Sequence, residues 1–190
     1  MNLSVERLSQ ILGAPEVIPA QVPWELAPER INIQLPSDYK EFVNRYGSVR
    51  ILGELSLWIP SLRPSSKGSP SGFEGFVWDT AQVAEELALA YEDDPDEQPY
   101  PVFPEAGGLL AWGNNANGSR CFWLTEGDDP DKWPVVIWYQ EIEEWDRIGC
   151  CMTDFLATLL TGGYRMMSEL IPASANAPLW SSQGDWNWTA

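Results

Sequence analysis

The stretch "LPSDYKEFVNRYG", residues 35–47, decides the fold that this sequence predicts. Four large apolar residues in it recur at the spacing i, i+3, i+4 and i+7: Tyr39, Phe42, Val43 and Tyr46. This spacing predicts a short helix with a single apolar stripe. A helix of about three turns is not stable alone in water, so the stripe must pack on another element.

Signals for the two ends of this helix flank the stripe. Ser37 is expected to cap the free amides of the first turn, and Asp38 complements the positive end of the helix dipole. Gly47 is expected to end the helix in a left-handed conformation. The segment "SVRILGELSLWIP", residues 48–60, then predicts two short strands that are broken at Gly53, the second with alternating apolar residues.

The chain before residue 35 predicts a helix and an extended leader. Residues 3–12 carry one apolar helical face, and Gly13 is a natural stop. Residues 14–36 contain five prolines, which exclude one long helix and leave room for a single helical turn around residues 24–31.

The middle of the chain alternates loop, helix and strand signals. Residues 60–76 are rich in Ser, Pro and Gly and predict a loop, followed by a helix from Asp79 to about Tyr91. The segments "GGLLAWG" (107–113) and "SRCFWLT" (119–125) predict a hairpin whose turn contains Asn117-Gly118. A third strand is predicted at "PVVIWYQ" (134–140), and a last helix is capped by Thr153 and ends at Gly162-Gly163.

These elements predict a single α+β domain, with helices packed on an antiparallel or mixed sheet. The domain is expected to span residues 1–165, including the N-terminal helix and the proline-rich leader. Residues 166–190 show no periodicity and are expected to form a loosely attached C-terminal tail.

The charge of the chain restricts its partners. It carries 28 acidic and 11 basic residues, a formal net charge of −17. Nucleic acids and anionic membranes are disfavoured, because both bind through Lys and Arg. High solubility and attraction to a basic protein partner remain. No stretch reaches the roughly 20 apolar residues of a membrane span, and residues 1–13 lack the pattern of a signal peptide, so we expect a cytoplasmic protein.

The residue types exclude several classes of enzyme. The sequence has no histidine and no phosphate-binding or nucleophile-elbow motif, and its acidic runs lack the spacing of a calcium loop. The three cysteines lack the spacing of a metal site or a disulfide framework, and we expect buried thiols. A carboxylate pair from "EIEEW" (141–145) with Asp146 stays open, as in a glycosidase, although a solvated acidic surface is favoured. For the strand tryptophans, a core role is favoured over a ligand platform.

Residues 35–47 resemble the LP-x-DY-x-x-F-x-x-x-YG signature of the SUKH superfamily. This superfamily includes bacterial immunity proteins and the fungal Smi/Knr-type regulators of cell-wall synthesis. The resemblance continues in the same order through "ILGELSLWIP" (51–60), "LLAWGNNANGSRCFWL" (109–124), "WPVVIWY" (133–139) and "MTDFLATLL" (152–160). It covers about residues 22–162.

The resemblance implies an α+β fold without a catalytic site, a metal or a cofactor. It also implies an immunity protein that binds and blocks a cognate toxin domain, often a nuclease. Two acidic clusters are the candidate contact residues for a basic toxin: Glu92, Asp93, Asp94, Asp96, Glu97, Asp128, Asp129 and Asp131. The alternatives are a regulatory or scaffold protein of the Smi/Knr type, and a glycan-binding domain that uses tryptophan platforms.

Overall fold

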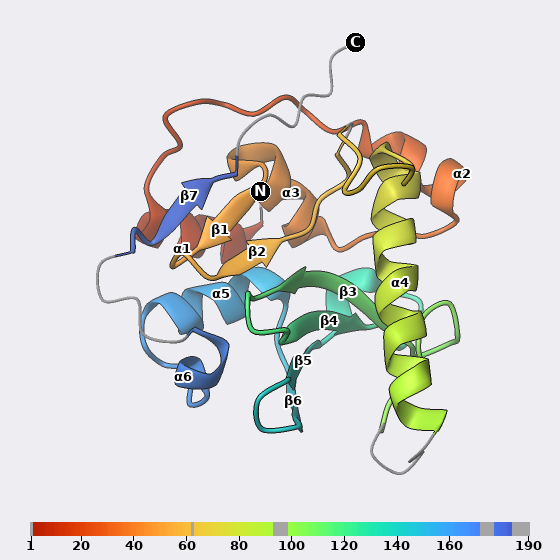
Figure 1. Ribbon diagram of the computed structural model, residues 1–190. Helices are drawn as coiled ribbons and strands as arrows, with labels where there is room; N and C mark the ends of the chain where they lie inside the picture. Colours follow the sequence, from red (N-terminus) through yellow and green to blue (C-terminus); the bar gives the residue numbers. More distant parts are fainter. Residues whose placement is uncertain (1, 62, 93–98, 172–176, 184–190) are drawn as a thin grey trace.

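The computed structural model describes residues 2–61, 63–92, 99–171 and 177–183, and Figure 1 shows their arrangement. The first part of the chain is mainly helical, as the sequence predicts. Its elements are α1 (Leu3–Leu12), the short 3-10 helix η1 (Trp24–Leu26), α2 (Ala27–Ile31) and α3 (Ser37–Tyr46).

One seven-stranded sheet, with the strand order β6-β5-β4-β3-β2-β1-β7, forms the centre of the molecule. Every pairing between its strands is antiparallel, so the predicted α+β fold with helices on an antiparallel sheet is confirmed. The strands are β1 (Val49–Ile51), β2 (Leu55–Leu57), β3 (Leu109–Asn114), β4 (Arg120–Leu124), β5 (Val135–Tyr139), β6 (Glu144–Ile148) and β7 (Trp180–Ser182).

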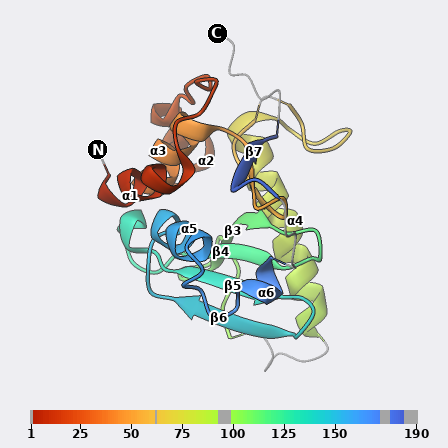
Figure 2. The same ribbon diagram turned by 90° about the vertical axis from the view of Figure 1, so that its left-hand side faces the viewer.

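Helices cover both faces of the sheet. The larger core lies between one face and the helices α1, α3 and α5 (Met152–Leu160), and includes the fully buried side chains of Trp112 and Trp123. On the other face, Val83 and Leu87 of α4 (Gly72–Glu92) pack on a smaller core. Figure 2 shows α5 and α4 on opposite sides of the strands β3 to β6. Because both faces are covered, β3 to β5 consist largely of consecutive buried residues.

The apolar stripe of α3 is buried, as predicted. The side chains of Tyr39, Phe42, Val43 and Tyr46 are all at most 3% exposed. The Tyr39 ring meets the Trp123 ring edge-on at 4.9 Å between centroids. The hydroxyl of Tyr46 donates a hydrogen bond to the carbonyl oxygen of Gly13 at 2.8 Å, which ties α3 to the end of α1. Burial of side chains of this size stabilises the fold by about 1.5–3 kcal/mol each.

The caps of α3 and α5 differ from the prediction. The side chain of Ser37 makes no capping hydrogen bond; instead its backbone N–H donates to Oδ1 of Asp131 at 2.6 Å. Thr153 is the second residue of α5 rather than its cap, and both its N–H and its hydroxyl donate to Oδ2 of Asp38, each at 3.0 Å. Each helix is therefore capped by a carboxylate that is distant in sequence, which local spacing does not predict.

Two other elements differ from the sequence prediction. Helix α4 begins at Gly72, seven residues before Asp79, because Phe73 and Phe76 are buried against the core and extend the helix into the expected loop. Strand β6 was not predicted, because its residues are charged and only partly buried at the edge of the sheet. In the described part of the chain no helix, α4 included, has the length and apolar composition of a membrane span.

The described residues of the expected C-terminal tail belong to the folded domain. Leu170 of the short helix α6 (Met167–Leu170) is fully buried, and Ile171 is 5% exposed. Strand β7 pairs with β1, and the indole N–H of Trp180 donates to the carbonyl oxygen of Leu12 at 3.1 Å. Residues 166–171 and 177–183 therefore contact the rest of the domain, whereas the sequence predicted a loosely attached tail.

The buried cap of α5 gives a prediction about stability. Replacement of Asp38 by Ala leaves the N–H of Thr153 buried without its acceptor, while the Thr153 hydroxyl keeps Oγ of Ser4 at 2.7 Å; the free energy of unfolding should fall by about 1–3 kcal/mol. Asp38→Asn should lose less, because the amide oxygen still accepts. Asp131→Ala is the matched control at an exposed cap, where water can hydrate the Ser37 amide. Equal losses in urea denaturation for the two alanine variants would contradict the assignment.

Candidate functional site

The first predicted acidic cluster lies at the end of α4. Glu92 is the last residue of this helix, while Asp93, Asp94, Asp96 and Glu97 lie outside the described residues. Their role as partner contacts stays a prediction.

The second predicted cluster lies at the start of the 3-10 helix η3 (Pro130–Lys132), and two of its three carboxylates stabilise the fold. Asp129 accepts a hydrogen bond from the N–H of Asp131 at 3.2 Å and pairs with Lys132 at 2.9 Å, and these contacts lower its pKa. Asp131 caps α3 through Ser37. Asp128 is exposed. The loop therefore presents fewer carboxylates to a partner than its sequence suggests.

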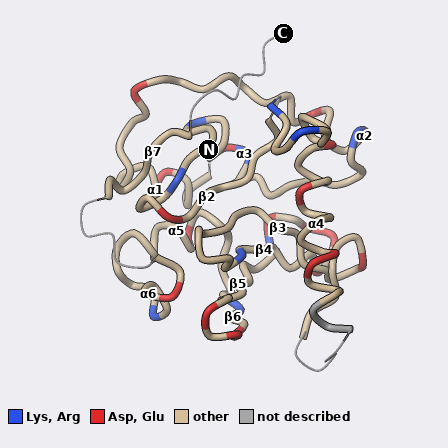
Figure 3. Tube along the Cα trace, viewed as in Figure 1, with Lys and Arg blue, Asp and Glu red and all other residues tan. Residues whose placement is uncertain are grey.

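The described parts of the two clusters lie on different sides of the sheet. Helix η3 contacts α3, whereas α4, which ends at Glu92, covers the opposite face (Figure 2). Figure 3 shows Asp and Glu spread over helices and loops rather than gathered in one place. The sequence could not reveal this separation, because it depends on which face each helix covers.

Two of the candidate carboxylates, Glu141 of "EIEEW" and Asp146, make separate contacts. Glu141 is exposed on the β5–β6 turn and accepts from the side-chain amide of Asn117 at 2.7 Å. Asp146 accepts from the hydroxyl of Tyr164 at 2.9 Å and pairs with Arg165 at 2.9 Å, so it ties β6 to the segment that follows α5. None of these carboxylates lines the groove described next.

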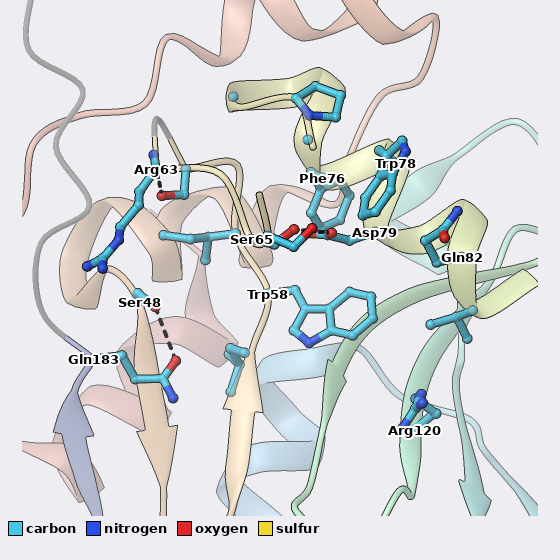
Figure 4. Close-up of a pocket in the computed structure, with 18 of the residues that line it drawn as sticks. Ser48, Trp58, Arg63, Ser65, Phe76, Trp78, Asp79, Gln82, Arg120 and Gln183 are labelled. Carbon is cyan, nitrogen blue, oxygen red and sulfur yellow. Dashed lines mark hydrogen bonds between the residues drawn. The ribbon is translucent and has the colours of Figure 1, made fainter. Parts of the chain in front are cut away.

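A groove of about 570 Å³, which the sequence does not reveal, lies between the first half of α4, the loop residues 63–72, Leu57 of β2 and Arg120 of β4. Figure 4 shows Trp58 on its floor, Trp78 and Gln82 on the α4 side, and Arg63 on the loop side. Such a volume lies within the range of small-molecule sites, roughly 300–1,000 Å³. The sequence indicates this groove only through the alternation of Leu55, Leu57 and Ile59. This alternation places Trp58 on the opposite face of the chain from these three apolar residues.

Three hydrogen bonds fix Trp58. Its backbone N–H donates to the carbonyl oxygen of Trp112 at 2.8 Å, and its own carbonyl oxygen accepts from the hydroxyl of Tyr39 at 2.7 Å. The indole N–H donates to Oδ1 of Asn114 at 2.7 Å. The ring is therefore held in one orientation, and α3 contributes directly to the floor of the groove through Tyr39.

The loop wall of the groove is attached to α4. The N–H of Gly72 donates to the carbonyl oxygen of Ser61 at 2.6 Å, and the hydroxyl of Ser65 donates to Oδ1 of Asp79 at 2.6 Å. A Cβ atom at Gly75 would lie 2.7 Å from the carbonyl oxygen of Pro70, so this close approach requires glycine. These contacts keep the loop against the helix.

Two of the four charged residues that line the groove, Arg120 and Glu86, are paired with each other. Arg120 forms an ion pair with Glu86 at 3.0 Å and also donates to the carbonyl oxygen of Gly118 at 2.8 Å. Partial burial raises the pKa of Asp79, and the hydrogen bond from Ser65 opposes this rise. Arg63 is exposed, and its guanidinium forms no ion pair with any residue that the structure describes.

The tryptophans divide between core and surface. The prediction of a core role is confirmed for Trp112 and Trp123, which are fully buried. Trp58 and Trp138 are only partly buried, and Trp78 of α4 is 37% exposed and lines the groove. The sequence could not separate these groups, because all strand tryptophans fit a half-buried pattern.

The cysteines are free thiols. Cys121 is buried, whereas Cys150 and Cys151 are partly buried. Burial raises the pKa of Cys150 to about 11, so this thiol is protonated and unreactive at neutral pH. Across the described ranges, no three His, Cys, Asp or Glu side chains come together in a way that could hold a metal ion.

The raised pKa of Asp79 gives a prediction about pH dependence. A carboxyl group whose pKa is raised by folding destabilises the folded state above that pKa, and the effect disappears below the unfolded value. Asp79→Asn removes the charge but can still accept from Ser65, so its melting temperature should exceed the wild-type value at pH 7. The difference should shrink as the pH falls toward 3–4. An equal gain in the control Asp128→Asn, which only reduces net charge, would contradict this explanation.

Comparison with known proteins places the chain in a family. A SUKH family model, described as SMI1-KNR4 cell-wall, matches residues 24–156, which is more than half of the chain. The matched part runs from η1 through α3 and the strands β1 to β6 into α5, and it includes the groove floor at Trp58. No curated protein and no solved structure matches the chain. The protein therefore belongs to the SUKH superfamily, as the signature in residues 35–47 indicated.

Proposed function

We propose that this protein is a cytoplasmic immunity protein that binds a cognate toxin domain and blocks it by direct occlusion. Its membership of the SUKH superfamily carries the proposal, because SUKH proteins are generally non-enzymatic immunity or regulatory proteins. The protein then acts as a binding module, without a cofactor and without contact to nucleic acid or membrane.

The net charge of −17 supports a basic partner. Toxins that cleave nucleic acids need Lys and Arg to bind phosphates, so their active surfaces are positive. An acidic inhibitor attracts such a surface over several ångströms and thereby gains association rate. The attraction weakens with salt, because the Debye length is only about 8 Å at physiological ionic strength.

Two contact surfaces are candidates within this proposal. One consists of Glu92, the last residue of α4, and of Asp93, Asp94, Asp96 and Glu97, which follow it in the sequence. The other is Asp128, presented by a loop that Asp129 and Asp131 stabilise. Since α4 and η3 lie on different faces of the sheet, one compact toxin domain is expected to contact mainly one of them.

The description of the matching family model favours one alternative, a regulatory or scaffold protein of the Smi/Knr type. Such a protein would not neutralise a toxin. Growth rescue therefore separates the two functions.

Co-expression with toxin domains from the same genome should restore growth for one basic toxin. The purified pair should bind with a Kd that rises steeply between 50 and 500 mM salt, because the attraction is between opposite charges. Binding can be measured by isothermal titration calorimetry. Failure to rescue growth from any such toxin would count against the proposal and favour the regulatory alternative.

Charge reversal identifies the contact surface. Glu92→Lys or Asp128→Lys should weaken binding at least tenfold if that residue lies in the interface. Glu16→Lys, on the exposed leader, makes the same change in net charge and serves as the control. Equal weakening by all three variants would mean that only the total charge matters and that neither cluster is the contact.

A further inference from the structure

Helix α4, which forms one wall of the groove, carries only negative charge. Its 21 residues include no Lys or Arg and five acidic residues: Glu74, Asp79, Glu85, Glu86 and Glu92. Two of the five line the groove, and one of these, Glu86, already pairs with Arg120 at 3.0 Å. The other, Asp79, forms no ion pair with any residue that the structure describes. Asp79 is therefore an acidic group of the groove whose charge is not compensated.

One oxygen of the Asp79 carboxylate is available to a ligand. The hydroxyl of Ser65 donates to Oδ1 at 2.6 Å, whereas Oδ2 accepts no hydrogen bond from the described residues. Partial burial raises the pKa of Asp79, because the carboxylate has lost part of its hydration. A neutral hydroxyl restores only part of this loss, and a cation at Oδ2 would restore more, since charged hydrogen bonds are stronger. This position therefore favours a positively charged group.

Aromatic side chains line the same part of the groove. Trp78, the neighbour of Asp79 in α4, is 37% exposed, and Figure 4 shows both residues on the α4 side, with Trp58 on the floor. The indole N–H of Trp58 donates to Asn114 at 2.7 Å, which holds this ring in one orientation. The face of a tryptophan ring attracts cations, most often a guanidinium group. An acceptor oxygen beside exposed aromatic surface therefore suits a guanidinium in particular.

Neither arginine of the groove prevents a cation from binding at Asp79. The charge of Arg120 is neutralised by Glu86. Arg63 is exposed, and Figure 4 shows it on the loop side, near Ser48 and across from Trp78. Water and salt screen the repulsion from an exposed group on the other side of the groove. The groove is thus divided into an acidic, aromatic α4 side and a basic loop side.

We propose that the α4 side of the groove receives an arginine side chain of the basic protein partner. The guanidinium donates to Oδ2 of Asp79 and lies against the ring of Trp78. Arg suits this position better than Lys, because its planar group stacks on aromatic rings and is more weakly hydrated. The net charge of −17 and the acidic residues of α4 complement a basic partner around this contact. The inference rests on the proposed function and adds a third contact surface with a defined occupant.

Two matched probes test the charge preference without a partner protein. N-acetylargininamide and N-acetylcitrullinamide have the same shape, but only the first is charged. NMR titration of the tryptophan indole N–H signals should give a Kd of about 1–10 mM for the arginine probe, as expected for a single side chain. The citrulline probe should bind at least fivefold more weakly. Equal binding of the two probes, no binding of the arginine probe at about 50 mM, or tighter binding of the neutral disaccharide cellobiose would overturn the proposal.

Three variants locate the site. Asp79→Asn should abolish the preference for the arginine probe, and Trp78→Ala should weaken this probe about threefold. Glu85→Gln removes the same charge from α4 at an exposed position outside the groove, and should leave binding unchanged. Asp79→Asn is expected to be more stable than the wild type at pH 7, so its loss of binding does not reflect unfolding. Equal effects of Asp79→Asn and Glu85→Gln would mean that only the total charge of α4 matters, which would overturn the assignment.

The same variants separate this inference from the proposed function. With a toxin that the protein neutralises in growth rescue, Asp79→Asn should raise the Kd at least about tenfold, whereas Glu85→Gln should raise it less than about threefold. Isothermal titration calorimetry measures both. Unchanged toxin binding by Asp79→Asn would overturn the groove contact and leave the proposed function intact. If no toxin is neutralised, the proposed function fails, and the two small probes still decide whether the groove binds arginine.

Discussion

The carboxylate of Asp38 accepts two hydrogen bonds from Thr153, which lies 115 positions further along the chain. The next residue, Tyr39, donates its hydroxyl to the carbonyl oxygen of Trp58. Adjacent residues of α3 thus hold the closing helix and the point where β2 leaves the sheet. Because α3 is only ten residues long and cannot persist in isolation, it is stable only while these distant partners are present. The helix and the sheet therefore form together.

The acidic residues have more than one role, although the sequence shows them as one excess of charge. Asp38 and Asp131 cap helices, Asp146 joins β6 to the segment after α5, and Glu86 neutralises Arg120. A count of charges gives the long-range field of the molecule but not the carboxylates that are free to meet a partner. Solvent exposure and hydrogen bonding decide which carboxylates can contact a partner. In the loop at 128–131, Asp129 and Asp131 make contacts within the fold, and Asp128 is exposed.

Sequence reasoning succeeded where the pattern is local. The stripe of α3, the hairpin turn at Asn117-Gly118 and the helix at 152–160 each follow from spacings within a dozen residues. It failed where tertiary contacts decide. The start of α4 depends on burial of Phe73 and Phe76, and β6 is a strand because β5 offers it a partner. The groove could not be predicted, because its walls come from segments that only the folded chain brings together.

The position of β7 has a consequence for the order in which the chain acquires its structure. Strand β1 ends at Ile51, and the strand that covers its outer side begins at Trp180. At ribosomal rates of about 5–20 residues per second, roughly six to twenty-six seconds separate the synthesis of the two. During that time the amide and carbonyl groups on the outer side of β1 have no strand partner. A nascent chain in which the sheet forms before β7 is added therefore carries an open sheet edge, a surface that can pair with other chains.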